Sequence, residues 1–294
     1  GLLLFTLTSI GEKVKLIVTP LGFPKINVPN DNPITKAKID LGEKLFFEKL
    51  LSRDSSISCA SCHNPSYAFT DGLQKARGIK NRKVSRNTPT LTNIAYNNSF
   101  LRDGVNPSLE AQVIVPIHEK NEFDFHILLV AERLKKKKEY IALFEKAFGE
   151  MPSPKLISNA IATYERTLIS GNSRYDKFMF HKDSSALSNE EIRGMQLFNK
   201  HSCVSCHSGF NFTNGEVVNN GIYKNYDDIG KMRVTLDSND KGAFKVPTLR
   251  NLTLTAPYMH DGSMKSLEAV IDHYIIGGFD NPNKDKRIKG VNLS

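Results

Sequence analysis

Two short stretches of the chain combine thiols and an imidazole at a fixed spacing. Residues 59–63 read CASCH and residues 203–207 read CVSCH, and together they contain every cysteine of the 294-residue chain. The Cys-x-x-Cys-His pattern is the attachment site of c-type haem, in which two thiols add to the porphyrin vinyl groups and the adjacent histidine binds the iron. The residues concerned are Cys59, Cys62, His63, Cys203, Cys206 and His207.

A redox dithiol, a zinc knuckle and a pair of disulfides are the alternatives for such cysteines. Each of them leaves unexplained why a histidine follows both motifs. The sequence therefore predicts two covalently bound haem c groups, with His63 and His207 as the proximal iron ligands. Because covalent haem c is attached outside the bacterial cytoplasm, we expect the protein in the periplasm or an equivalent compartment.

A helix is predicted to lead into each motif. In residues 34–47 apolar side chains recur at helical spacing, and Thr35 stands where an N-cap is expected. In residues 187–198, Ser188 and Glu191 have the spacing of a capping box. Both haem sites are therefore expected in small, cytochrome-like helical units.

A longer internal repeat accompanies the motifs. The block PTLTN at 89–93 matches PTLRN at 247–251, and an Asp-Gly pair at 103 matches one at 261; 247−89 and 261−103 both equal 158. The motifs themselves are offset by 144 (203−59), so the second half has a loop longer by 14 residues, which fits the polar stretch 219–241. Repetition on this scale indicates duplication of a structural unit.

The boundary between the two units is predicted near residue 170. Residues 156–168 have the pattern of an amphipathic helix, and residues 170–173 (SGNS) are typical of a break. The expected domains are residues 1–170 and 171–294.

Composition narrows the choice of partners. No run of about 18 apolar residues occurs, so no membrane span is predicted. Residues 1–7 are too short for one, and fit either the end of a signal peptide or an N-terminal strand.

The formal net charge of +9 favours an acidic protein partner. Nucleic acid is not expected, because the four lysines at 135–138 lie in a helix-like stretch beside glutamates. Both a monomer and a homodimer remain open.

The two haem motifs, the two PTLxN blocks and residues 256–263 (APYMHDGS) resemble the di-haem cytochrome c peroxidase and MauG family. The resemblance covers about residues 21–278. It implies a mainly α fold of two cytochrome c-like helical domains, each with one haem, and a calcium ion between them. Calcium would be bound by the side chain of Asn87 and by the backbone carbonyls of Thr255 and Pro257, together with water.

The repeat predicts that the two irons differ in their second axial position. The offset of 158 pairs Pro116 with Tyr274 (274−158), and proline cannot bind iron whereas a phenolate can. Haem 1 is therefore predicted to be five-coordinate, and haem 2 six-coordinate through His207 and Tyr274. Alternative ligands are His273, Met264 and, more weakly, Met259.

The resemblance places the chain on the MauG side of the family. Members of the MauG type have tyrosine where Tyr274 stands, whereas the usual bacterial cytochrome c peroxidases have methionine. Those peroxidases also have a histidine after the first motif that must leave haem 1 before peroxide binds. Residues 64–89 contain no histidine, so haem 1 is expected to need no reductive activation.

Peroxide cleavage requires a group that moves a proton between the two oxygens. By resemblance this group is Glu122, with Gln112 at the position of the family's distal glutamine. Glu119 and His118 are the local alternatives.

The chain departs from the family in having no tryptophan. Arg102 stands where the family has the tryptophan between its haems, and His201 stands where MauG has a tryptophan two residues before its second motif. Electron transfer between the haems must then use other groups, such as propionates, the backbone or Tyr96.

The function favoured is a MauG-like peroxidase that takes electrons from a protein or a small reductant. A detoxifying cytochrome c peroxidase fed by a small cytochrome, and a di-haem electron carrier without enzymatic activity, are the alternatives.

Overall fold

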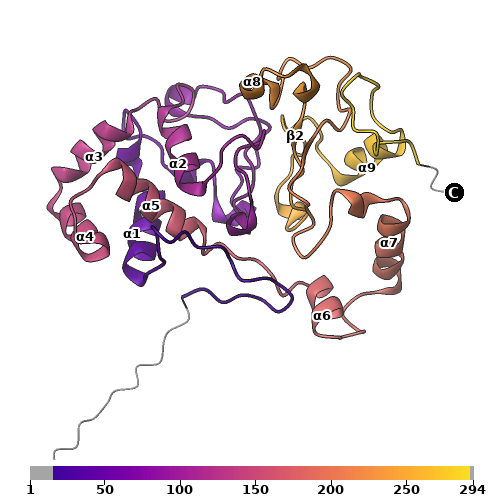
Figure 1. Ribbon diagram of the computed structural model, residues 1–294, viewed down its shortest axis with the longest axis horizontal. Coiled ribbons are helices and arrows are strands. Elements are labelled where there is room, and N and C mark those ends of the chain that lie inside the picture. The colour runs from indigo at the N-terminus through magenta and orange to yellow at the C-terminus, as the bar shows by residue number, and fades with distance from the viewer. Residues whose placement is uncertain (1–15, 292–294) are drawn as a thin grey trace, which may run out of the picture.

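The computed structural model describes residues 16–291 and is mainly helical (Figure 1). The predicted mainly α character is therefore confirmed. The alternatives for residues 1–7 lie outside the described residues. The helices are α1 (Lys36–Phe46), α2 (Leu109–His118), α3 (Ile127–Lys135), α4 (Lys138–Phe148), α5 (Pro154–Glu165), α6 (Arg174–Phe180), α7 (Asn189–Lys200), α8 (Met232–Thr235) and α9 (Leu267–Ile275). Strands β1 (Val217–Val218) and β2 (Phe244–Lys245) pair antiparallel.

Helices α1 to α5 gather in one lobe, which Figure 1 shows in indigo to magenta. Their apolar faces enclose a core whose fully buried members include Leu41, Leu45, Phe46, Ile157 and Ile161. Helix α1 crosses α5 closely at Gly42, where an added Cβ would lie 2.0 Å from the carbonyl oxygen of Ala160. Only glycine permits this approach.

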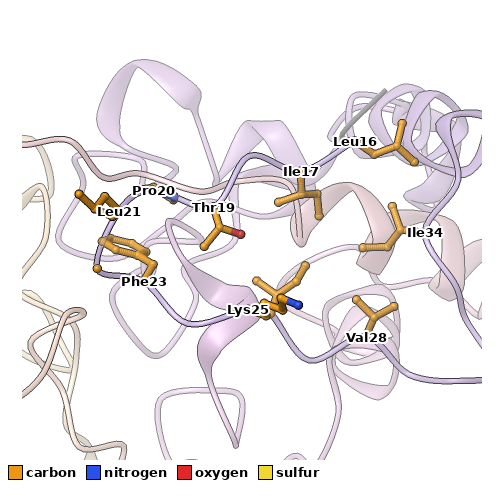
Figure 2. Close-up of a pocket in the computed structure, with 11 residues that line it drawn as sticks. Leu16, Ile17, Thr19, Pro20, Leu21, Phe23, Lys25, Val28 and Ile34 are labelled. Atoms are coloured by element: carbon orange, nitrogen blue, oxygen red, sulfur yellow. The ribbon is translucent and has the colours of Figure 1, made fainter. Parts of the chain in front are cut away.

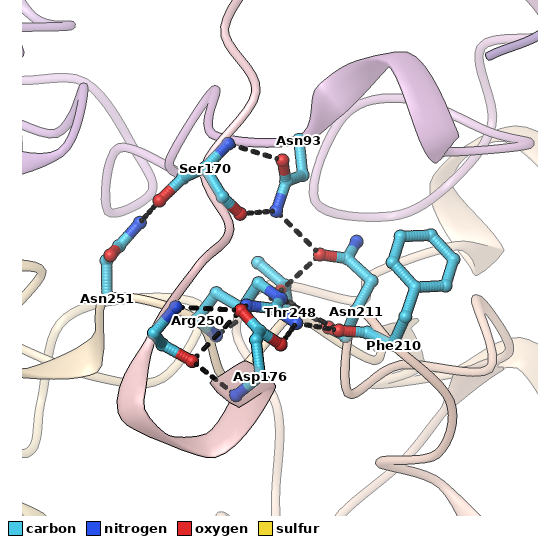
Figure 3. Close-up of polar contacts among 9 residues, drawn as sticks. Asn93, Ser170, Asp176, Phe210, Asn211, Thr248, Arg250 and Asn251 are labelled. Atoms are coloured by element: carbon cyan, nitrogen blue, oxygen red, sulfur yellow. Dashed lines mark hydrogen bonds and ion pairs between the residues drawn. The ribbon is translucent and has the colours of Figure 1, made fainter. Parts of the chain in front are cut away.

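Helices α6 to α9 form the other lobe together with long loops (Figure 1). Here a polar contact holds segments together: Arg250 forms a buried ion pair with Asp176 at the start of α6, and also donates to the carbonyl of Phe210 (Figure 3). The guanidinium also lies 4.5 Å from the ring centroid of Phe23. Removing this buried guanidinium would strongly lower the stability of the fold, because the carboxylate of Asp176 would be left buried and unpaired.

The predicted caps are observed. Thr35 accepts from the backbone of Lys38 at the start of α1, and Ser188 and Glu191 form the capping box of α7. The helix expected over residues 156–168 is α5, which begins and ends earlier, at Pro154 and Glu165. The polar stretch 219–241 contains the short helix α8.

The repeated PTLxN blocks meet at the segment between the lobes. Asn93 exchanges two hydrogen bonds with the backbone of Ser170, at 2.8 and 3.0 Å, and Asn251 donates to the Ser170 hydroxyl at 3.2 Å (Figure 3). Both asparagines have left-handed backbones, with φ of 61° and 59°. The repeated asparagine is thus used twice to hold the chain where it passes from one lobe to the other.

The lead segment before α1 also contacts both lobes. Residues 16–34 curve around a hollow of about 610 Å³ that their own apolar side chains line (Figure 2). Phe23 packs against Tyr96 of the first lobe and Phe210 of the second, with ring centroids 5.9 and 4.6 Å away. The hollow is lined only by this lead segment, so the chemistry has to be sought at the two motifs.

Candidate haem sites

The first motif folds into a single tight turn. Residues Cys59–Ser61 form a 3-10 turn, and the backbone N–H of His63 donates to the carbonyl of Cys59 at 2.9 Å. The turn begins at Ser58, whose N–H donates to the Ser61 hydroxyl at 3.0 Å. Both thiols and the imidazole are therefore carried by the same short turn of the chain.

The His63 ring is oriented by one backbone contact. Its Nδ1 lies 2.9 Å from the carbonyl oxygen of Phe69, which can only accept, so Nδ1 carries the proton. Burial lowers the pKa of His63 and keeps the imidazole neutral. The unprotonated Nε2 is then available, which is the form in which histidine binds iron.

The second motif repeats this geometry. Residues Cys203–Ser205 form a 3-10 turn, His207 donates from its backbone to Cys203 at 2.9 Å, and its Nδ1 lies 3.1 Å from the carbonyl oxygen of Phe212. Burial also lowers the pKa of His207. The residues of both motifs therefore fit haem c, since each pair of thiols is accompanied by a neutral imidazole with one nitrogen free.

The thiols themselves are unpaired. All four cysteines are free, so no disulfide competes with haem attachment. Burial raises the pKa of Cys59 and raises that of Cys62 to about 12, which keeps both in the thiol form.

Tyr274 faces the second motif from α9. Burial raises the pKa of Tyr274, and the neighbouring Cys206 and Cys203 add to the shift. The amide nitrogen of Asn220 lies 3.4 Å from the phenol oxygen and lowers the pKa in part. The structure thus brings the predicted ligand and the second motif to one place.

Two of the alternative ligands, His273 and Met259, lie close to Tyr274 and contact the same residue, Asn220. His273 is buried, and its Nε2 lies 3.1 Å from the carbonyl oxygen of Asn220. The Met259 sulfur lies 3.5 Å from the Asn220 amide nitrogen, the same group that contacts Tyr274. Met264 pairs with Tyr258 through its backbone. Tyr274 stays the predicted ligand because of its match with Pro116 in the repeat, and Asn220 is a neighbour that the sequence did not point to.

The first motif faces α2 and the loop after it. Pro116 lies within α2 and Gln112 lies one turn earlier, so that both share a face of the helix. After α2 the chain turns back, with the N–H of Glu122 donating to the Glu119 carbonyl at 3.0 Å and the Glu122 carbonyl accepting from Ile79 at 2.9 Å. Gly78 permits this fold, because an added Cβ would lie 1.9 Å from the Asn121 oxygen.

The carboxyl of Glu122 lies near the first motif. Its charge acts on the thiols of Cys59 and Cys62 and raises their pKa. Burial, and secondarily the charge of Glu119, raise the pKa of Glu122 to about 7. At neutral pH this group is therefore poised between its protonated and ionised forms, as a proton-transferring group must be.

The local alternatives to Glu122 are less suitable as the proton-transferring group, because their side chains are exposed. Glu119 is exposed. His118 is exposed, accepts from the backbone of Ile127 at 3.1 Å through Nε2, and stacks on His126. Neither side chain is enclosed as Glu122 is.

Known proteins resemble this chain over most of its length. The family model described as di-haem cytochrome c peroxidase matches residues 36–184. The methylamine utilization protein MauG of Methylorubrum extorquens is 41% identical, over 90% of this chain and 76% of its own length. The chain belongs to the di-haem cytochrome c peroxidase family. It is therefore an oxidoreductase that acts on peroxide.

Other members of the family show how widely the likeness extends. The cytochrome c551 peroxidase of Nitrosomonas europaea is 35% identical over 79% of this chain and 71% of its own length. The crystal structure of a MauG-like protein associated with microbial copper homeostasis superposes with a TM-score of 0.86 at 30% identity, covering 94% of this chain and 90% of that one. The fold is thus that of the di-haem peroxidases.

One buried carboxyl group near the first haem motif of this peroxidase was not predicted from the sequence. Glu165, at the end of α5, is 4% exposed, and its Oε2 has no hydrogen-bond partner among the residues that the structure describes. Burial raises its pKa to about 8, and its charge acts on Cys59. In the sequence it appears as an ordinary polar residue of an amphipathic helix, and no spacing rule distinguishes it.

The two positions where the family has tryptophan differ in their surroundings. The carbonyl oxygen of His201 lies 4.0 Å from the Cys203 sulfur, so this residue adjoins the second motif. Arg102 instead contacts Asn87, the expected calcium ligand. Tyr96, named as a route between the haems, packs against Phe210 of the other lobe with ring centroids 4.8 Å apart.

Within residues 16–291, no helix is both long enough and apolar enough to cross a membrane.

Proposed function

We propose that this chain is a MauG-like peroxidase in which residues 1–170 and 171–294 are two cytochrome c-like domains, each with one covalently bound haem c. The observation that carries the proposal is the difference between equivalent positions. Tyr274 places a phenol beside the second motif, whereas the first motif has Pro116 at the matching position. One iron is thereby left open to peroxide and the other is closed by the protein.

The haems, when bound, supply the peroxide-binding and one-electron chemistry. The thiols of Cys59, Cys62, Cys203 and Cys206 attach them. His63 and His207 each hold a proton on Nδ1 through a backbone carbonyl, and present Nε2 in a fixed direction. A histidine fixed in this way cannot rotate without breaking its partly buried hydrogen bond.

Glu122 moves the proton at the open site. With a pKa of about 7, its carboxylate accepts a proton from peroxide at neutral pH and returns it to the departing oxygen, so that water leaves. Gln112, on the same helix face as Pro116, supplies an amide that can orient the peroxide. Partial burial of the Glu122 carboxyl keeps bulk water from competing for this proton.

Tyr274 sets the character of the closed site. A phenolate oxygen is anionic and stabilises the oxidised forms of iron, whereas a thioether favours the reduced form. Asn220 holds the phenol oxygen through its amide. A haem held there by His207 and Tyr274 would therefore be suited to storing an oxidising equivalent rather than to admitting electrons.

Hydrogen peroxide is the oxidant, and a protein electron donor or protein substrate is the partner. The net charge of +9 favours an acidic one. We place the protein in the periplasm, because haem c attachment occurs outside the cytoplasm. The calcium ion predicted from the resemblance is not part of this proposal, because the side-chain oxygen of Asn87 accepts a hydrogen bond from the guanidinium of Arg102.

The experiment that tests the proposal is a peroxide titration of the ferric di-haem protein, followed by its absorption spectrum. We expect the absorption bands of both haems to change together, and the changed spectrum to persist until a reductant is added. Turnover that depends only on a reduced small cytochrome would favour the detoxifying peroxidase. A spectrum that does not respond to peroxide would favour the electron carrier.

Haem content is tested separately by a pyridine haemochrome assay and by mass spectrometry of the intact chain. Two covalently bound haems are expected, and fewer would contradict the assignment of the motifs.

A further inference from the structure

Arg102 and Asn87 make a close contact where the two lobes meet. The Arg102 guanidinium donates through Nη2 to the side-chain oxygen of Asn87, and through Nε to its backbone oxygen at 3.1 Å. Asn87 is 4% exposed, and its amide nitrogen donates to the carbonyl of Leu73 at 3.0 Å. Both oxygens of Asn87 are therefore directed at a single cation.

This contact belongs to the junction between the lobes. The backbone N–H of Asn87 donates to the carbonyl of His260 at 2.9 Å, and the carbonyl of Arg102 accepts from the N–H of Lys245 at 2.8 Å. Both partners come from the second lobe. The guanidinium thus ties Arg102 to Asn87, and the backbone of each of these two residues is hydrogen-bonded to the second lobe.

The one side chain among the expected calcium ligands, that of Asn87, is not free in this arrangement. Calcium takes six to eight oxygen ligands, and Asn87 was the one side chain expected among them. Its oxygen already accepts from Arg102. Across residues 16–291, no group of three or more acidic, histidine or cysteine side chains is placed to hold a metal ion, so nothing anionic replaces the lost ligand.

The charges around the contact also disfavour a divalent cation. Four cationic side chains gather here, Arg86, Arg102, Arg233 and Lys245, against three carboxylates, Asp103, Asp228 and Asp261. Arg86 and Arg233 both bind Asp103 at 2.7 Å, and Arg86 also binds Asp228. The cluster therefore already carries one positive charge more than its carboxylates neutralise.

Arg102 stays charged in this setting. Burial and the nearby Arg86 lower its pKa to about 10, which is still well above neutral pH. His260 adds no charge, because burial lowers its pKa to about 4 and its ring stacks on Phe244 with centroids 3.8 Å apart. A planar guanidinium that donates to two oxygens at once is well suited to such a fixed position.

We propose that the guanidinium of Arg102 takes the place of a calcium ion at the junction of the two lobes, so that this di-haem peroxidase assembles without calcium. By the resemblance, the family has tryptophan at this position, and a tryptophan side chain carries no positive charge that could take the place of a metal ion. Here the same position supplies the cation from the chain itself.

The test uses the di-haem holoprotein and three variants. Arg102→Gln removes the cation from Asn87; Arg102→Lys keeps the charge but cannot donate to both oxygens in the same way. Arg233→Gln is the matched control, because it removes a charge from the same cluster without touching Asn87. Each protein is equilibrated with calcium chloride, desalted and analysed for bound calcium, and its Tm is measured in calcium chloride and in EGTA.

We expect the wild type, Arg102→Lys and Arg233→Gln to retain no calcium and to have the same Tm in both buffers. Arg102→Gln should retain one calcium per chain and melt at a higher temperature in calcium chloride, because a ligand that binds only the folded state stabilises it. Calcium retained by the wild type would overturn the proposal. An Arg102→Gln protein that folds and still ignores calcium would overturn it as well.

If Arg102→Gln fails to fold, the wild-type and Arg102→Lys measurements still decide, since calcium bound to either contradicts the proposal and its absence from both supports it. Neither calcium content nor Tm depends on peroxide turnover, so this proposal and the proposed function can fail independently.

Discussion

The two Cys-x-x-Cys-His motifs have the same local geometry but different surroundings. Both histidines bond through Nδ1 to a backbone carbonyl five or six residues later. Around the first motif the chain places the carboxyls of Glu122 and Glu165, whereas around the second it places the phenol of Tyr274 and the amide of Asn220. The attachment chemistry is thus duplicated, while the groups that decide reactivity are not.

This difference assigns a role to each half. Carboxyls with raised pKa values hold and release protons near neutral pH, which suits a site where peroxide is cleaved. A phenol held by an amide offers a fixed oxygen ligand, which suits a site that stores an oxidised state. If the two halves differ in this way, substitution of Glu122 should have the largest effect and substitution of Asn220 the smallest.

Glu122→Gln should slow peroxide consumption by about a hundredfold or more, the usual scale for losing an acid–base group. Stopped-flow kinetics of the ferric protein with peroxide measure this rate. Both haems should remain bound, since Glu122 does not take part in attachment. Glu150→Gln, at an exposed glutamate that follows α4, is the control and should be close to wild type; an unaffected Glu122→Gln protein would move the role to Glu119, His118 or water.

Tyr274→Met should raise the reduction potential of haem 2, because a neutral sulfur replaces an anionic oxygen and ferric iron loses charge compensation. Spectroelectrochemistry measures the potential. The same variant should shorten the life of the state formed with peroxide.

Tyr274→Phe removes only the oxygen and should change the haem 2 spectrum. Tyr223→Phe, whose hydroxyl contacts Asp261 in the same lobe, is the control. If Tyr274→Phe leaves the spectrum and the potential as they were, Tyr274 is a packing residue, and His273 and Met264 become the candidates.

The rate of the first reaction with peroxide should depend on pH through Glu122. Burial raises the pKa of Glu122 to about 7, so below that pH the carboxyl is protonated and cannot accept a proton. The rate should therefore fall about tenfold for each unit of pH below 7 and level off above it. A profile that is the same in Glu122→Gln would show that another group titrates.

Asn220→Ala should have the smallest effect. It removes one hydrogen bond from the Tyr274 oxygen, worth about 1 kcal/mol, which corresponds to a shift in the haem 2 potential of tens of mV. The shift should be smaller than that of Tyr274→Phe. Asn283→Ala, at a partly exposed position in the same lobe, should leave the potential unchanged; an Asn220→Ala shift as large as that of Tyr274→Phe would make Asn220 part of the ligation itself.

The sequence by itself determined the features that depend on neighbouring residues. The haem motifs, the cap at Thr35 and the capping box of Ser188 and Glu191 each lie within a few positions, so their spacing fixes their geometry. The repeat also aligned Pro116 with Tyr274, because duplicated units keep equivalent positions in equivalent places.

The tertiary structure alone decided which distant groups meet. Asn220 reaches Tyr274 from 54 positions away, and Glu165 is brought beside Cys59 by the packing of α5. Only the folded chain shows that Arg102 donates to the Asn87 oxygen that the resemblance assigns to calcium. Burial set the pKa of Glu122 and Glu165, and burial is a property of packing that the order of residues along the chain does not reveal.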